Sequence, residues 1–367
     1  MTRLRKSGPV SQTLDLILNL DKNLYHPIVI ALYAEDDNNT MLKEYTEAGA
    51  DYFCLNIGRL ESLAKGGKLV ADFMEEIKPD IIHSVGMPLY KMAICYKGCP
   101  NFTTIHNYVF EDYPVKYGKV LGNLMALQDI AIIKRNADHM VTCSKSLSLM
   151  YFNKKGISVD YIRNGVDTSR YQVASVVQKE KKRERLDLPL NKIIAVFTGQ
   201  VCSRKNQAFA VEGIVENNRD DLCIVLLGDG PELKTLKEKY ANCKKVVFRG
   251  QVSNVAEYLQ AADFYVSSST SEGLPIGVLE AMSAGLPQLL SDIIQHKEII
   301  EFDDNLGIVF ENNNLQSFNL ALNELLKRNL NEMGQKCHQI ASTKLSAEYM
   351  AKKYEDKYEK LILAEDK

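Results

Sequence analysis

Short apolar runs alternate with amphipathic stretches along almost the whole chain. The runs are rich in β-branched residues, and the stretches between them show helical periodicity. Strands that are apolar on both faces are typical of parallel sheets covered by crossover helices. The pattern predicts a doubly wound α/β fold. The expected strands are 26–34, 51–57, 79–86, 101–107 and 138–144 in the first half, and 192–199, 222–230, 245–250, 263–269 and 287–292 in the second.

A polar segment, VVQKEKKRERLDLPLN, separates the two series of strands. It is too charged to be core, so we interpret it as the first exposed stretch of a second domain, with the boundary near residues 165–172. A chain of 367 residues has room for two domains, since length divided by about 150 is the usual prior. We expect domains at 1–168 and 169–345, and a last helix in 346–367.

The beginning of the chain departs from this pattern. A doubly wound domain normally opens with a buried strand, a glycine-containing turn and a helix. The turn Ser7-Gly8-Pro9 and a helix at 10–20 are present, but MTRLRK before them is basic and unlike a strand. We therefore expect the first strand to be missing or truncated. Either the true start lies upstream, or these residues form an abbreviated strand.

Composition and charge narrow the class of protein. Hydrophobic residues make up 46% and charged residues 25% of the chain, as in ordinary globular proteins. The formal charge of −2 disfavours a dedicated nucleic-acid binder. Eight scattered cysteines indicate reduced thiols without a disulfide or zinc framework. No second cysteine or histidine pair stands at a zinc-like spacing, so no bound metal is expected. The sequence contains neither a signal peptide nor an apolar run long enough to span a membrane, so a cytoplasmic location is expected.

The first strong chemical signal is the segment KIIAVFTGQVCSRKNQ. A predicted strand enters a turn at Gly199, and the adjacent cations Arg204 and Lys205 follow it. Backbone amides, a helix dipole and positive side chains in one turn suit an anion such as a diphosphate. Taken alone, the segment would be better explained as an ordinary strand–helix connection with surface cations.

The second signal is SEGLPIGVLEAMSAGLP, directly after the strand at 263–269. Its glycine-rich turn precedes a helix beyond the carboxyl end of a strand, where open α/β sheets bind ligands. Glu280, about one turn into that helix, suits the two hydroxyls of a ribose, and we expect Glu272 at the mouth of the site. For two isolated glutamates, exposed helix acids stabilised by the dipole are the simpler alternative.

These two segments resemble those of glycosyltransferase family 4, whose members are retaining, nucleotide-sugar-dependent enzymes of the GT-B fold. SEGLPIGVLEAMSAGLP carries the most specific likeness. The other matching blocks are PDIIHSVG, TTIHN, ADHMVTCS, IRNGVD, TGQVCSRKNQ, LLGDGPEL, VVFRGQV and AADFYVSSSTSEG. The resemblance implies two Rossmann-like domains that face each other across a cleft, with the donor on the second and the acceptor on the first. The last helix is expected to cross back to the first domain.

The resemblance also implies roles for particular residues. Glu280 would bind the donor ribose, Lys205 would neutralise the leaving diphosphate, and His106 would lie beside the transferred sugar. The implied catalytic residues are His106, Lys205 and Glu272, and the implied substrate-binding residues are Gly8, Gly199, Arg204, Gly228, Val252, Gly273, Leu274, Pro275, Ile276 and Glu280. The family has an arginine directly after the glycine matched by Gly199, but this chain has Gln200. Whether Arg204 replaces that arginine stays open.

The activity implied by the resemblance is a retaining, metal-independent transfer of a hexose from a nucleoside-diphosphate sugar, UDP- or GDP-linked. The expected acceptor is a glycan or lipid-linked glycan in bacterial surface polysaccharide synthesis, such as that of lipopolysaccharide O-antigen or capsule. The nucleotide sugar is a substrate, and no cofactor is expected. Two alternatives are a nucleotide-sugar 2-epimerase of the same fold and a catalytically degenerate nucleotide-sugar-binding protein.

One further segment, YGKVLGNLMALQDIAIIKR at 117–135, is amphipathic and flanked by lysine and arginine. We interpret it as a packing helix whose apolar stripe is buried in the first domain, because lipid-binding helices usually carry a larger cationic face. The alternative is contact with anionic lipid, which would make this a peripheral protein on the inner face of the cytoplasmic membrane.

Overall fold

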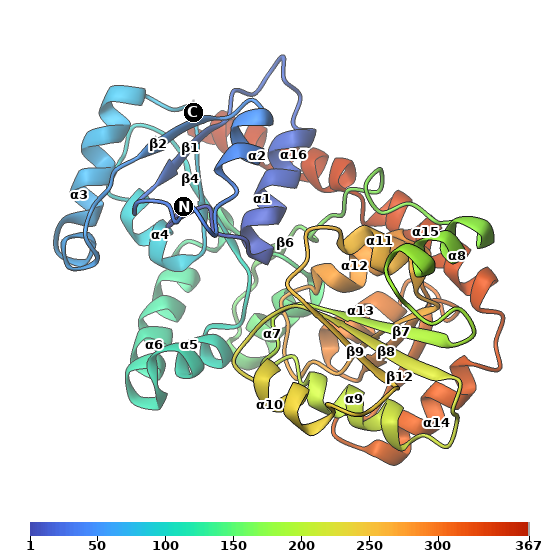
Figure 1. Cartoon of the computed structure of the whole chain (residues 1–367). Helices are drawn as coiled ribbons and strands as arrows, with labels where there is room; N and C mark the ends of the chain where they lie inside the picture. Colours follow the sequence, from blue (N-terminus) through green and yellow to red (C-terminus); the bar gives the residue numbers. More distant parts are fainter. Residues whose placement is uncertain (366–367) are drawn as a thin grey trace. The chain divides into compact units, whose positions relative to one another are not determined.

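The computed structural model describes residues 1–365. The chain divides into two compact units (Figure 1). Unit 1 comprises Met1–Gly165 together with the C-terminal segment that begins at Ala347, and unit 2 is Val166–Ser346. Both units are built from parallel strands joined by helices, as the alternation of apolar runs and amphipathic stretches predicts.

Unit 1 contains two separate parallel sheets, in the orders β1-β2 and β3-β4-β5-β6. Its strands are β1 (Ile28–Ala31), β2 (Asp51–Cys54), β3 (Ile82–Val85), β4 (Asn101–Ile105), β5 (Met140–Thr142) and β6 (Asp160–Tyr161). Its helices are α1 (Gly8–Asn19), α2 (Leu42–Glu47), α3 (Arg59–Ile77), α4 (Met87–Ala93), α5 (Val109–Tyr117), α6 (Lys119–Arg135), α7 (Lys145–Lys155) and α16 (Ala347–Glu365), with a 3-10 turn at Ala137–His139.

The first residues of the chain lie along one edge of β1. The amino group of Met1 donates to the carbonyl of Ile30, and the amide of Leu32 donates to the carbonyl of Met1 at 3.0 Å. These contacts use the edge of β1 that does not pair with β2, because Ala31 bonds to Leu55 on the other side. MTRLRK is thus extended beside β1 at its beginning, although no strand is assigned to these residues.

The last helix, α16, packs on unit 1 through a buried polar and aromatic cluster. His83 on β3 bonds through Nδ1 to the hydroxyl of Tyr358 at 2.6 Å and through Nε2 to Thr104 Oγ1 at 2.8 Å. Thr104 in turn contacts the hydroxyl of Tyr354 at 2.9 Å. Burial, with a smaller effect of His106, lowers the pKa of His83 to about 3. His83 is therefore a neutral core residue that ties α16 to the sheet.

Unit 2 contains one parallel sheet in the order β12-β11-β10-β7-β8-β9. Its strands are β7 (Ile193–Thr198), β8 (Leu222–Leu227), β9 (Val246–Gly250), β10 (Phe264–Ser267), β11 (Gln288–Ser291) and β12 (Gly307–Phe310). Its helices are α8 (Val176–Arg185), α9 (Gln207–Glu216), α10 (Leu233–Lys239), α11 (Val255–Ala261), α12 (Ile276–Ser283), α13 (Ile294–Ile300), α14 (Leu315–Leu325) and α15 (Leu330–Lys344).

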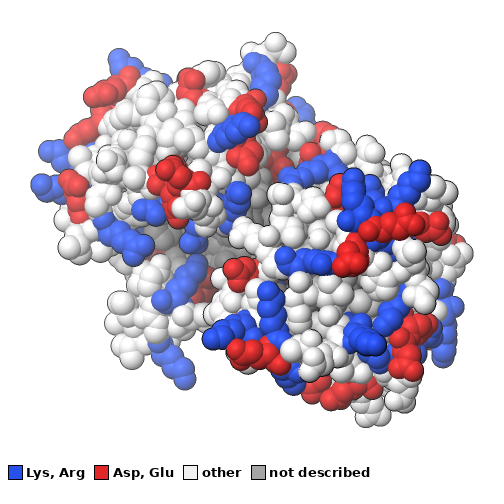
Figure 2. Space-filling view, viewed as in Figure 1, with Lys and Arg blue, Asp and Glu red and all other residues white. Residues whose placement is uncertain are grey.

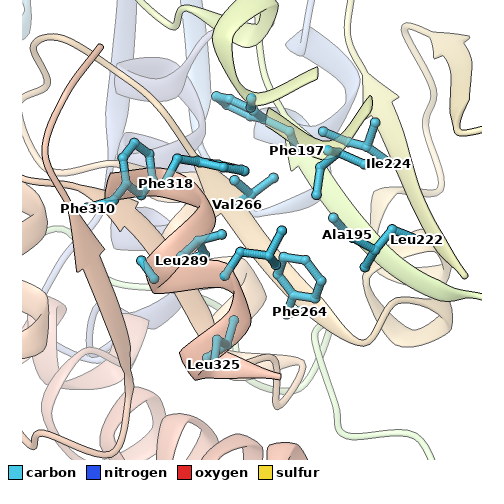
Figure 3. Close-up of a cluster of buried hydrophobic side chains, with 14 of the residues drawn as sticks. Ala195, Phe197, Leu222, Ile224, Phe264, Val266, Leu289, Phe310, Phe318 and Leu325 are labelled. Carbon is cyan, nitrogen blue, oxygen red and sulfur yellow. The ribbon is translucent and has the colours of Figure 1, made fainter. Parts of the chain in front are cut away.

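The core of unit 2 forms where this sheet meets α9 and α14. Phe197, Phe264 and Leu289 on the strands pack with Phe310 of β12 and with Phe318 of α14. All of these side chains are almost completely buried (Figure 3). The central strands β7, β8 and β10 are covered on both faces, which explains their unbroken apolar runs. This packing holds the carboxyl ends of the central strands in fixed positions.

Two edge strands are absent from the sequence prediction. β6 has only two residues, Asp160–Tyr161, and both are exposed. β12, Gly307–Phe310, is a short apolar run that follows a charged turn and pairs with β11. Edge strands pair on one side only and need less apolar surface, so their sequence signal is weaker than that of the central strands.

Candidate active site

The predicted donor-site residues lie at the carboxyl-terminal end of the unit 2 sheet. The chain runs from β7 through β8 to β9 in one direction, whereas β10, β11 and β12 lie on the other side of β7. The strand order therefore reverses between β7 and β10. Open α/β sheets bind ligands at such a switch point, outside the carboxyl ends of the strands. Lys205 follows β7, and Glu272 and Glu280 follow β10.

The turns after β7 and β8 approach each other closely. Gly199 has φ +121° and Gly228 has φ +140°, values that favour glycine. A Cβ on Gly228 would lie 2.0 Å from the carbonyl oxygen of Gly199, so no larger residue fits. The side chain of Lys205 lies against Gly199, because a Cβ built there would be 3.7 Å from Nζ. The ammonium group is thus held at the junction of two backbone turns.

Arg204 and Lys205 converge on one carboxylate. Lys205 Nζ lies 2.7 Å from Glu272 Oε1, and Arg204 NH1 donates to Oε2 at 2.8 Å. Adjacent side chains usually diverge, but a tight turn brings these two together: the amides of Lys205 and Asn206 both donate to the carbonyl of Cys202. Arg204 and Lys205 therefore contact the same carboxylate, and replacement of the family arginine by Arg204 stays a prediction.

Glu272 is buried, not at the mouth of the site as the sequence suggested. Its relative exposure is 7%. Ser269 Oγ donates to Oε1 at 2.8 Å, so both carboxylate oxygens have partners. Burial alone would raise the pKa of Glu272, but Lys205 and Arg204 outweigh it and lower the pKa to about 2. The carboxylate is charged at all ordinary pH values and holds the two cations in place.

Glu280 lies one turn into α12, as the spacing predicts, and has a partner that the sequence analysis missed. The hydroxyl of Tyr171 donates to Glu280 Oε1 at 2.6 Å. Burial raises the pKa of Glu280, while Tyr171, Arg170 and Lys205 act in the opposite direction. Tyr171 closely follows the IRNGVD block, and this position is the signal from which the sequence could have identified it. Through its hydrogen bond, Tyr171 fixes the orientation of the Glu280 carboxylate.

The turn between the two glutamates is packed tightly against the sheet. Gly273, Leu274 and Pro275 are buried, and Ile276 begins α12. A Cβ on Gly277 would lie 2.4 Å from Thr198 Oγ1 and 2.6 Å from the hydroxyl of Tyr265. The start of α12 therefore packs directly against the side chains of Thr198 on β7 and Tyr265 on β10. Glu280 lies near enough to Lys205 to be affected by its charge.

Val252 lies in the turn after β9 and is half-buried. The amide of Gly228 donates to the carbonyl of Gly250 at 2.7 Å, which links the turns after β8 and β9. Arg249, in contrast, donates to the carbonyls of Leu186 and Asp187, both at 2.7 Å. The turn with Val252 thus extends the candidate site along the sheet edge, whereas the Arg249 side chain has a structural role.

A second layer of polar groups supports Glu272. Ser291 Oγ donates to the carbonyl of Ser269, and His296 Nδ1 lies 3.0 Å from both the hydroxyl and the carbonyl of Ser291. Burial lowers the pKa of His296 to about 4, so the ring is neutral at pH 7. The sequence analysis left His296 as a core or surface residue. The structure makes it a core residue that supports the loop bearing Glu272.

In unit 1, His106 follows β4 and lines a cavity of about 10 Å³, room for roughly one water molecule. The lining residues include Gln12, His83, Thr104, Asn164 and Tyr354. Burial lowers the pKa of His106 to about 4. The ring is therefore neutral at pH 7 and is suited to a hydrogen bond, not to carrying a positive charge.

Gly8 is the exposed first residue of α1. One turn later, Gln12 Nε2 donates to the carbonyl of Gly165 at 2.8 Å and its Oε1 accepts from the amide of Gly165 at 2.9 Å. Gln12 thereby ties α1 to the NGV turn, and it lines the same cavity as His106. The sequence analysis missed this residue; the signal was a glutamine on the apolar side of a helix.

Other parts of the structure bear on metals and membranes. Among residues 1–365, no three histidine, cysteine or acidic side chains are grouped so that they could hold a metal ion. Within that range, no helix is both long and apolar enough to span a bilayer. One hollow in unit 2, about 560 Å³, is lined by residues of 168–173 and α15 and by none of the predicted donor-site residues.

Two family descriptions match the chain in consecutive segments. Residues 7–170 match the description "Glycosyltransferase Family 4", and residues 178–344 match "Glycosyl transferases group 1". Together they extend over both units and include the candidate-site residues of each.

Named relatives agree with these matches. The chain is 30% identical to UDP-Gal:alpha-D-GlcNAc-diphosphoundecaprenol alpha-1,3-galactosyltransferase of Escherichia coli, over 73% of this chain and 72% of that protein. It is 25% identical to the O-antigen biosynthesis glycosyltransferase WclY of Escherichia coli, over 95% and 94%. Among solved structures, sucrose-phosphate synthase from Thermosynechococcus elongatus superimposes with a TM-score of 0.83 at 18% identity, over 98% of this chain and 94% of that one.

Proposed function

This chain belongs to glycosyltransferase family 4 and is a glycosyltransferase, and from that premise we propose that it transfers a hexose from a UDP-sugar with retention of configuration and without a metal ion. The acceptor in this proposal is a glycan linked to a diphosphate lipid. The observation that carries the proposal is the convergence of Lys205 and Arg204 on Glu272 at the switch point of the unit 2 sheet.

Charge explains the use of these cations. Transfer breaks the bond between the anomeric carbon and the diphosphate oxygen, so negative charge develops on the leaving group while the sugar becomes oxocarbenium-like. Lys205 and Arg204, held by Glu272, supply fixed positive charge in a partly water-excluded turn, where such charge stabilises a transition state most effectively. The acceptor hydroxyl forms the new bond, and its proton passes to the departing phosphate.

The remaining residues position the donor. Glu280, oriented by Tyr171, accepts hydrogen bonds from the ribose hydroxyls, and the turn with Val252 receives the base. His106, neutral at pH 7, hydrogen-bonds a sugar hydroxyl near the reacting carbon.

The relatives support the choice of donor and acceptor. The galactosyltransferase relative is named for UDP-Gal and for a GlcNAc-diphosphoundecaprenol acceptor, and the second relative is named for O-antigen biosynthesis. We extend these classes to this chain: a UDP-hexose as donor and a lipid-diphosphate-linked sugar as acceptor, in assembly of a surface polysaccharide.

The direct test is to incubate the purified protein with UDP- and GDP-hexoses and a short-chain lipid-diphosphate sugar. We expect transfer from a UDP-hexose, an unchanged rate in EDTA because the cations come from side chains, and an α-linked first product by proton NMR from an α-linked donor. Formation of an epimer, binding without turnover, or a β-linked product would contradict the proposal.

Replacing Glu280 by glutamine should raise the donor KM about tenfold to a hundredfold, because a charged hydrogen-bond acceptor is worth roughly 1.5–3 kcal/mol. The same variant should lose the preference of the native enzyme for a ribose donor over its 2′-deoxyribose analogue. Initial-rate kinetics with both donors measures this.

The matched control for this substitution is Glu238→Gln on α10. That carboxylate is exposed and pairs with Lys234 in the same helix at 4.0 Å. The Glu238→Gln variant should therefore have the native donor KM. If Glu280→Gln kept full discrimination against the deoxy donor, the ribose assignment would be wrong.

A further inference from the structure

One face of unit 1 carries exposed apolar side chains. They belong to α5 and α6, and we call them the hairpin face: Val115, Tyr117, Val120, Leu121, Leu124 and Leu127. Val115 is 80% and Val120 79% exposed. The spacing of 120, 121, 124 and 127 places these residues on one side of α6. The interpretation of 117–135 as a helix with a buried apolar stripe is therefore wrong for this side.

The opposite side of α6 is firmly packed. Gly122, Ala126, Asp129 and Ile133 are buried, again at helical spacing. A Cβ on Gly122 would lie 2.5 Å from the carbonyl oxygen of Tyr113, so α5 and α6 are in close contact. The sequence pattern could not distinguish the two sides, because both are apolar.

A buried ion pair fixes the orientation of the hairpin. Asp129 of α6 is fully buried, with its carboxylate 2.8 Å from Lys91 Nζ of α4 and 2.5 Å from the hydroxyl of Tyr113 of α5. Leaving this carboxylate without its partners would cost several kcal/mol. The hairpin therefore cannot easily rotate to bury the exposed leucines, and the hairpin face stays turned to solvent.

Cationic side chains flank the hairpin face. Lys119, Lys134 and Arg135 are exposed on α6, whereas the carboxylates Asp112 and Glu111 of α5 pair with Lys116 and Lys154. Asp129 is the one acidic residue between 113 and 135, and it is the buried partner of Lys91. Figure 2 shows the region formed by α5 and α6 as mostly uncharged atoms with Lys and Arg side chains beside them.

We propose that the hairpin face docks on a bilayer that contains anionic phospholipid. Apolar side chains would enter the boundary between headgroups and acyl chains, Tyr117 suits the headgroup level, and the cations would bind lipid phosphates. The inference rests on the proposed function in one respect: docking would bring the enzyme to a lipid-linked acceptor, which resides in a membrane. Docking itself is measured without sugar transfer.

The test is co-sedimentation with vesicles of phosphatidylcholine alone or mixed with phosphatidylglycerol. The native protein should bind mixed vesicles at least about tenfold more tightly than neutral ones, and high salt should remove the difference. Leu121→Glu/Leu124→Glu should weaken binding to mixed vesicles by at least about a hundredfold. Lys134→Glu/Arg135→Glu should weaken it about tenfold or more.

The matched control is Leu60→Glu/Leu63→Glu on α3, whose side chains are 84% and 82% exposed in the same unit. This variant should bind vesicles as the native protein does. Both leucine variants should keep the native thermal midpoint and the native rate with a water-soluble acceptor, because neither pair of side chains packs in the core or lies at the candidate site.

Three results would overturn the proposal. These are native vesicle binding by Leu121→Glu/Leu124→Glu, no binding by the native protein, or a dimer in sedimentation that only this variant abolishes, which would make the face a protein–protein interface. Vesicle binding without transfer by any form would instead count against the proposed function alone.

Discussion

Replacing Lys205 by alanine is expected to lower kcat about a thousandfold. Its ammonium group is the buried cation at the turn where the leaving diphosphate is proposed to bind, and removing one preorganised electrostatic contact costs about a hundredfold to a thousandfold in comparable sites. The donor KM should rise less, because the stabilisation is largest for the charge that develops during bond cleavage. Steady-state kinetics with a UDP-hexose donor measures both quantities.

Two further variants separate catalysis from folding. Lys205→Ala leaves Glu272 buried with Arg204 as its remaining cation, which destabilises the fold. Lys205→Ala/Glu272→Ala removes both charges, so it should recover thermal stability while staying inactive. Lys179→Ala, which breaks the ion pair with Asp263 at 2.9 Å elsewhere in unit 2, should keep full activity. A kcat for Lys205→Ala within tenfold of the native value would rule out the assigned role.

Lowering the pH from 7 to 5 should destabilise unit 1 by about 4 kcal/mol and unit 2 by about 2 kcal/mol. Each buried histidine contributes roughly 1.4 kcal/mol per pH unit, and only over the range below its unfolded pKa near 6.5. Burial lowers the folded-state pKa of His83 to about 3, and of His106 and His296 to about 4, whereas an unfolded histidine titrates near 6.5. The unfolded chain then binds more protons, so stability is complete above pH 6.5 and is lost as the pH falls toward 4.

Calorimetry measures this effect, and we expect each unit to contribute its own unfolding transition. The transition of unit 1, with His83 and His106, should move further than that of unit 2, with His296. His83→Asn should flatten the pH dependence of unit 1 by about half. His26→Gln, at an exposed histidine that pairs with Asp51, should change it little. Equal transition midpoints at pH 5 and pH 7 would show that these histidines are not buried in neutral form.

The local segments of the fold are well predicted. The GT-B fold is confirmed by the parallel sheets of the two units and by the structural likeness to a sucrose-phosphate synthase. Lys205 and Glu280 lie where the strand–turn–helix segments predict them, after β7 and one turn into α12. Each of these positions depends on residues close in sequence, whose apolar spacing and turn chemistry can be read directly.

The contacts that define the site are not local. Tyr171 bonds Glu280 across 109 positions, and Arg204 bonds Glu272 across 68. The burial of Glu272 follows from how β7 and β10 become neighbours, which no short motif encodes. The same holds for the extended residues at the start of the chain, which align with β1 although their own sequence is polar.

By itself, then, the amino-acid sequence determined the two parallel-sheet units, the family, and the positions of the turns that bear cations and carboxylates, because strand, turn and helix signals act over a few residues. The tertiary structure alone decided which charges meet, which glutamate is buried and which side of α6 is exposed. These depend on packing between segments distant in the chain, where burial and partner geometry, not residue type, set the energy of a charge or of an apolar surface.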